Sequence, residues 1–406
     1  MATCFLIVIY LAFISLGLPD SLLGSAWPVM WPQLGAAFGS AGILSMIVAG
    51  GTIVSSLASS RMVSRLGTGT ITLLSCVLTA SALLGFSFSP SFLWLVLMAI
   101  PLGLGAGSVD AALNHYVAEN YKAHHMNWLH CFWGVGATVG PVIMSYFIAV
   151  HSSWRGGYRS IAFIQFSLVI ILLATLPMWK RVAQSREHEA SQEALPGSAD
   201  NQSEQISAGN TQAGKASNVL QIRGVKNTLI SFLFYCGVEA TIGLWGASFM
   251  VDGGSVTPET AAGRISLYYG GITVGRLLTG FFALRIHNRI LIRYGQLVAI
   301  SGGILLLVPL PVSISYLGFI LIGLGLAPIY PGLLHETPAR FGKGNASKLM
   351  GYQMAVAYTG TTILPPLFGA AATRWGIFLF PMIVMAYLVI MLISTEKVNH
   401  VLKREM

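Results

Sequence analysis

The chain has 406 residues, of which 54% are apolar and only 9% are charged, with a mean hydropathy of +0.71. Soluble proteins carry about 25% charged residues, so this composition excludes an ordinary soluble domain and indicates a membrane-spanning protein. The net charge of +9 does not indicate a nucleic-acid partner, because the basic residues gather in loops on one side of the expected membrane.

Apolar segments recur along the whole chain. A segment of about 20 mostly apolar residues can cross a hydrocarbon core of about 30 Å. We expect twelve such segments, at residues 5–28, 41–63, 70–88, 91–118, 125–150, 159–180, 225–250, 261–284, 289–309, 313–338, 347–372 and 376–396. The first has neither a basic region before it nor a small-residue cleavage site after it, so we interpret it as a retained helix rather than a signal peptide. The sequence predicts an all-α integral membrane protein.

The loops between these segments differ in charge from one side to the other. Assigning alternate loops to opposite sides gives one side eighteen Lys and Arg residues and leaves the other side with Arg155, Arg159, Arg264 and Arg374. Lys and Arg accumulate in cytoplasmic loops, so we expect the rich side, with both termini, to be cytoplasmic. We further expect a bacterial inner-membrane protein that is a monomer, with a small solute and the lipid bilayer as its partners.

A polar stretch divides the chain into two related halves. Residues 184–218 are rich in Ser, Gln and Ala and nearly free of large apolar residues, which predicts a largely disordered linker at 181–224 between bundles at 1–180 and 225–406. "GLGAGSVDAALNHYV" from Gly103 matches "GLGLAPIYPGLLHET" from Gly323, and other pairs repeat at nearly the same shift. Two such repeats are the arrangement of the major facilitator superfamily, whose solute site lies between the halves.

A few ionisable residues lie well inside the apolar segments: Asp20, Asp110, His130, Glu239 and Arg276. A charge at the bilayer centre costs about 3 kcal/mol, so each is a functional candidate, the alternative being a structural ion pair or a neutral acid bonded to backbone. Desolvation disfavours the charged form of a carboxyl group, which lets it bind and release a proton. We therefore predict that Asp20 and Asp110 couple transport to protons. Sodium remains an alternative coupling ion, and we expect no other cofactor and no metal site.

Arg276 is the only cation that we expect deep in the membrane. We predict that it pairs with Glu239 on the preceding helix, as a structural or gating pair.

The fifth segment carries a polar stripe. Asn127, His130 and Trp133 follow one another at intervals of one helical turn, and Asn114 lies one turn after Asp110 in the fourth segment. Amide and imidazole groups beside an indole suit the hydroxyls and the C–H face of a sugar. The alternative is that Asn127 and His130 only bond neighbouring helices. Further candidates for lining the solute site are Trp27, Trp245, Tyr330 and Gln353.

Several motifs resemble one branch of the major facilitator superfamily. "GLPDSLLGSAWP", "GLGAGSVDAALN" and "NWLHCFWGVGATVGP" are similar to the first, fourth and fifth helices of the fucose/galactose/glucose:proton symporters, and "YCGVEATIGLWGA" and "YYGGITVGRLLTGF" to the seventh and eighth. The resemblance implies that Asp20 and Asp110 act in proton coupling and sugar binding and that Asn114 contacts sugar. His130 stands where the fucose symporter has a sugar-binding Gln.

We therefore expect a secondary transporter that moves a sugar or similar hydroxylated solute by alternating access, as a proton symporter. The alternative is a proton-driven exporter of a metabolite or drug. An enzyme is disfavoured because the sequence has no nucleophile beside a base, no metal-ligand spacing and no phosphate-binding loop.

Overall fold

The computed structural model describes residues 2–121, 123–193, 219–254, 256–309 and 311–403. Nearly all of these described residues are helical, and none of them is in a strand. The first half contains α1 (Ala2–Asp20), α2 (Leu22–Gln33), α3 (Ser40–Leu66), α4 (Thr68–Ser87), α5 (Phe92–Asn120), α6 (Ala123–His151) and α7 (Trp154–Glu193). The second contains η1 (Val219–Gln221), α8 (Val225–Gly254), α9 (Pro258–Phe282), α10 (Asn288–Leu307), α11 (Val312–Leu326), α12 (Ile329–His335), α13 (Thr337–Phe341), α14 (Lys343–Trp375), η2 (Ile377–Leu379) and α15 (Phe380–Lys403).

Each of the twelve expected segments falls on these helices, the first on α1 and α2 together. Ten stretches of the described residues are long and apolar enough to cross a membrane. The two remaining segments correspond to α9 and α14, which are as long as the spans but less apolar, with Arg276 in α9 and Lys348 in α14. Within the second half they pack against α11 and α8, respectively, so they complete the second helical bundle.

The segment between the bundles differs from the expectation at both ends. Helix α7 continues to Glu193, so residues 181–193 are helical rather than part of a disordered linker. Their Glu, Ala and Gln residues are good helix formers even without an apolar face, which explains the extension. Residues 194–218 of the expected linker lie outside the described residues. At the other end, Val219 is buried with Phe341 and Val398, so this part belongs to the second half.

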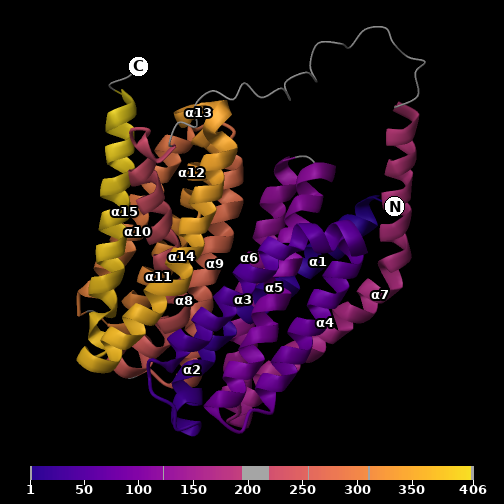
Figure 1. Cartoon of the computed structure of the whole chain (residues 1–406). Helices are drawn as coiled ribbons and strands as arrows, with labels where there is room; N and C mark the ends of the chain where they lie inside the picture. Colours follow the sequence, from indigo (N-terminus) through magenta and orange to yellow (C-terminus); the bar gives the residue numbers. More distant parts are fainter. Residues whose placement is uncertain (1, 122, 194–218, 255, 310, 404–406) are drawn as a thin grey trace.

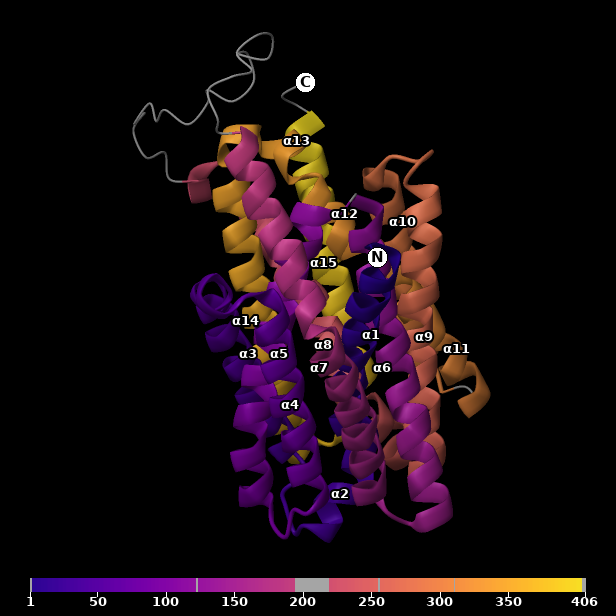
Figure 2. The same cartoon turned by 90° about the vertical axis from the view of Figure 1, so that its right-hand side faces the viewer.

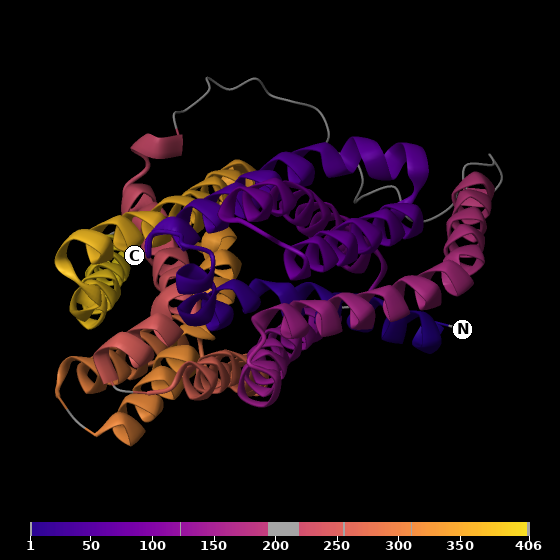
Figure 3. The same ribbon diagram turned by 90° about the horizontal axis from the view of Figure 1, so that it is seen from below.

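The two halves lie side by side (Figure 3) and meet mainly at one end (Figure 1). Helices α2, α3 and α6 of the first half contact α8, α14 and α9 of the second. From the end where α2 lies, the halves diverge toward the end where α13 and the C-terminus lie, and Figure 2 shows α1, α6 and α9 running alongside one another. The opening is therefore at the end where α13 and the C-terminus lie.

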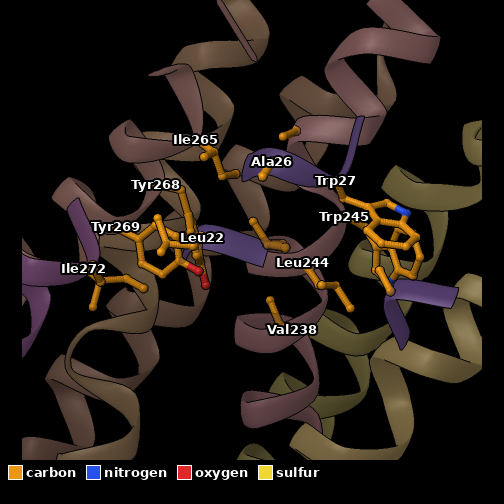
Figure 4. Close-up of a cluster of buried hydrophobic side chains, with 14 of the residues drawn as sticks. Leu22, Ala26, Trp27, Val238, Leu244, Trp245, Ile265, Tyr268, Tyr269 and Ile272 are labelled. Carbon is orange, nitrogen blue, oxygen red and sulfur yellow. The ribbon is translucent and has the colours of Figure 1, made fainter. Parts of the chain in front are cut away.

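A cluster of buried side chains closes the end where the halves meet (Figure 4). We call it the inter-half seal, made of Leu22, Ala26, Trp27, Leu244, Trp245, Tyr268 and Tyr269. Helices α2 and α8 approach so closely that a Cβ on Gly24 would collide with the backbone of Gly243. Because neither backbone can yield easily, Gly24 is required for the seal to close.

Candidate functional site

Asp20 lies where the first span breaks. It is the last residue of α1, it follows Pro19, and α2 begins after Ser21. Proline removes a backbone donor and kinks a helix, which accounts for the break. The side chain of Asp20 is exposed to solvent, although its neighbours Leu18 and Leu22 are buried. Because the inter-half seal closes the α2 end, solvent reaches Asp20 from the open end.

Trp133 of α6 contacts Asp20 directly. Its indole Nε1 donates a hydrogen bond to Oδ2 of Asp20 at 2.7 Å. The guanidinium of Arg276 from α9 lies 5.1 Å from the centroid of the same indole, in a cation–π contact. The sequence predicted Trp133 as a solute-stacking residue. In this conformation its donor and its ring instead engage two charged residues, one from each half.

Arg276 pairs with Glu239, as predicted from the sequence. Nη2 of Arg276 lies 3.5 Å from Oε1 of Glu239, and the two side chains are 16% and 21% exposed. The contact is long for a charge-assisted hydrogen bond, so the pair is loose and can rearrange. The hydroxyl of Tyr268 donates to the backbone oxygen of Glu239 at 3.3 Å, which fixes α9 against α8 at this point.

Asp110 of α5 is the second acid of the first half. Its Oδ1 accepts a hydrogen bond from Nδ2 of Asn114 at 2.9 Å, one turn further along the helix. Asp110 is partly exposed and close enough to Asp20 to interact with it electrostatically. Within the described part of the chain, neither carboxylate forms an ion pair with a Lys or Arg. The two acids of the first half therefore lack the cationic partner that Glu239 has.

Two of the remaining predicted residues lie near this group. His130 is partly exposed, packs edge-on to Phe13 at 6.0 Å, and interacts electrostatically with Arg276. Tyr330 is partly exposed, with its hydroxyl 2.9 Å from Sδ of Met354. The side chain of Asn127 lies outside the described residues.

Three predicted lining residues lie instead in packed interiors. Trp27 is fully buried and donates to the backbone oxygen of Phe38 at 2.8 Å, while Trp245 is fully buried and donates to that of Pro365 at 2.9 Å. Gln353 is also fully buried and bonded through its amide to Thr337. Their polar atoms are already satisfied within the protein, so in this conformation none of the three is available to a solute.

Thr273 is a residue of the site that the sequence analysis missed. It lies one turn before Arg276 on α9, where its Oγ1 is 3.4 Å from that of Thr138 and its backbone oxygen is 4.0 Å from Sγ of Cys131. A Cβ on Gly134 would collide with its side chain. In the sequence, the spacing of one helical turn between Thr273 and Arg276 was the signal that could have identified Thr273. Thr273 holds α9 against α6 beside Trp133.

Paired helical bundles with an accessible acid between them are typical of membrane transporters. The chain belongs to the Major Facilitator Superfamily, whose sequence pattern matches residues 9–351. As a member of this superfamily it is a transporter and not an enzyme.

Two curated proteins and a solved structure are similar to the chain. The bypass of stop codon protein 6 of Saccharomyces cerevisiae is 23% identical over 401 residues, which cover 91% of this chain and 77% of that protein. The glucose/mannose transporter GlcP of Bacillus subtilis is 24% identical over 260 residues, covering 61% of this chain and 58% of GlcP. A crystal structure of the nucleoside transporter NupG has a TM-score of 0.72 at 13% identity, covering 96% of this chain and 98% of that one. At that identity, the structural likeness establishes the fold alone.

Proposed function

We propose that this transporter is a proton-coupled symporter for a sugar or a similar hydroxylated solute. The observation that carries the proposal is Asp20, an acid that solvent reaches between the halves and that has no cationic partner among the described residues. A carboxylate in that setting can take up a proton from water and lose its charge before the halves move. Asp110 acts with it, because each acid is within electrostatic range of the other.

Asn114, Asn127 and His130 are the proposed solute ligands. Asn114 bonds Asp110, so a sugar hydroxyl at this point would sense the charge of that acid. His130 is partly exposed on α6, the helix that also carries Trp133. Two of the similar proteins are named as transporters of glucose and mannose and of nucleosides. These solutes are all hydroxylated, which supports the same class of solute for this protein.

The opening of the halves fits an inward-facing state. The C-terminus, on the proposed cytoplasmic side, lies at the end where the helices diverge (Figure 1). We place the protein in a bacterial inner membrane as a monomer. An inward-facing symporter has released its proton to the cytoplasm, which is consistent with an ionised Asp20 that accepts the Trp133 hydrogen bond.

Uptake into proteoliposomes tests the proposed function. Vesicles with the purified protein are given labelled hexoses, deoxyhexoses, nucleosides and drugs, with a pH gradient, with a sodium gradient, or with neither. We expect one class of hydroxylated solute to accumulate only under the inward-directed proton gradient. Accumulation that follows sodium instead would refute proton coupling, and proton release on substrate addition would favour the exporter.

A further inference from the structure

The contacts of Trp133 join the proposed proton site to the charged pair of the other half. Asp20, on α1, accepts the indole N–H, and Arg276, on α9, lies over the ring and contacts Glu239. The contacts form one continuous chain, from an acid of the first half to an acid of the second. Trp133 is its central member.

The backbone on either side of Trp133 is held firmly. A Cβ on Gly17 would collide with the backbone oxygen of Trp133, so α1 presses on α6 three residues before Asp20. On the opposite side, Gly134 leaves no room between α6 and Thr273. With these helix contacts fixed, the indole hydrogen bond and the cation–π contact are the parts that can change when a proton arrives.

We propose that Trp133 is a positioning residue that couples the protonation state of Asp20 to the Arg276–Glu239 pair across the two halves. The inference rests on the proposed proton symport. A hydrogen bond to an ionised carboxylate is about twice as strong as one to a neutral acceptor. While Asp20 is ionised, the indole is tied to it and presents its ring to Arg276. When Asp20 takes a proton on its free oxygen, the bond weakens, the ring is released, and Arg276 loses its contact with the indole.

Other titratable groups surround Asp20. Asp110 from α5, Glu239 from α8 and Tyr269 from α9 interact with it electrostatically. None of these three supplies a positive charge, and Arg276 reaches the region through the ring of Trp133. Asp20 and Glu239 also act on each other through space, and the indole adds a contact route from Asp20 to Arg276.

Trp133→Phe tests this role because it keeps an aromatic face for Arg276 and removes the N–H donor. Two transport modes are compared in proteoliposomes: exchange of labelled for unlabelled solute, which needs no net proton movement, and accumulation under a gradient of one pH unit. With one proton per solute, that gradient supports at most about tenfold accumulation. For Trp133→Phe we expect exchange within about twofold of wild type and accumulation that falls close to onefold. Trp128→Phe, on the same helix with its indole 53% exposed, is the matched control.

The outcomes separate the role of Trp133 from the proposed function. Full accumulation by Trp133→Phe, or an equal loss of exchange and accumulation, would overturn the coupling role. A wild-type protein that exchanges solute but never accumulates it under the pH gradient would instead overturn the proton symport.

A spectroscopic readout covers the case in which Trp133→Phe does not fold. A single 5-fluorotryptophan is introduced at position 133 of the otherwise unchanged protein, and its 19F resonance is followed between about pH 5 and pH 8. We expect the resonance to move with pH and to become insensitive to pH when Asp20→Asn is added. A resonance that does not move in a protein that accumulates solute contradicts the inference.

Discussion

The two halves of this transporter carry similar acids in different electrostatic settings. Glu239 of the second half has Arg276 beside it, whereas Asp20 of the first half has a tryptophan N–H and solvent. A paired acid keeps its charge and holds helices together, while an acid without a cation can exchange that charge for a proton. The comparison supports the proposal that the proton binds in the first half, while the charged pair of the second half holds helices in place.

The largest effect is expected from Asp20→Asn. Asn keeps the shape and can still accept a hydrogen bond from Trp133, but it cannot take up a proton. Accumulation under a gradient of one pH unit should fall from as much as about tenfold to none, and uptake should lose its dependence on pH. If uptake by Asp20→Asn keeps the wild-type pH dependence, Asp20 does not take part in proton coupling.

Breaking the paired acid should damage stability instead. Glu239→Gln leaves Arg276, which is only 16% exposed, without its acid. We expect this to cost about 3 kcal/mol, and much less solubilised protein should survive heating. Arg276→Gln should cost less, since Glu239 can then bind a proton and become neutral. The double variant should recover most of the loss.

Glu396→Gln is the matched control for the stability measurement. It breaks the more exposed pair that Glu396 makes with Arg293. The free energy of unfolding should then fall by less than about 1 kcal/mol. Equal losses in Glu239→Gln and Glu396→Gln would contradict a structural role for the central pair.

A smaller effect is expected at the inter-half seal. Gly24→Ala inserts a methyl group where α2 meets α8, and overpacking of this kind costs about 1 to 3 kcal/mol. The cost falls on the closed seal, so the equilibrium should move toward the state in which the seal is open. A cysteine introduced at buried Ala26 should then react roughly fivefold or more faster with an impermeant maleimide. Gly50→Ala, with open space around the added Cβ, should change nothing.

The smallest effect is expected from Trp27→Phe. The variant removes the hydrogen bond to Phe38 inside the seal, at a cost of about 1 kcal/mol. The melting temperature should fall slightly, and accumulation under a pH gradient should stay at the wild-type level. Trp27 is therefore expected to act only in packing, whereas Trp133 is expected to act in proton coupling. A loss of accumulation in Trp27→Phe would contradict this difference.

The sequence predicted the helical spans, the two related halves and the pairing of Arg276 with Glu239. The pair was predictable because Arg276 is the only cation expected deep in the membrane and an acid precedes it on the neighbouring helix. The bond from Trp133 to Asp20 was not, because it depends on a rotamer and on the approach of α1 to α6. Trp27, Trp245 and Gln353 were expected to line the solute site but are buried. In an apolar chain, composition does not distinguish a packing face from a cavity face.

The most direct test of the account is a proton measurement with two variants side by side. Solute is added to lightly buffered proteoliposomes, and the external pH is recorded for wild type, Asp20→Asn and Glu396→Gln, which breaks only the pair with Arg293. The account predicts that the medium becomes alkaline with wild type and with Glu396→Gln, and that it does not change with Asp20→Asn. Alkalinisation that persists in Asp20→Asn would contradict it.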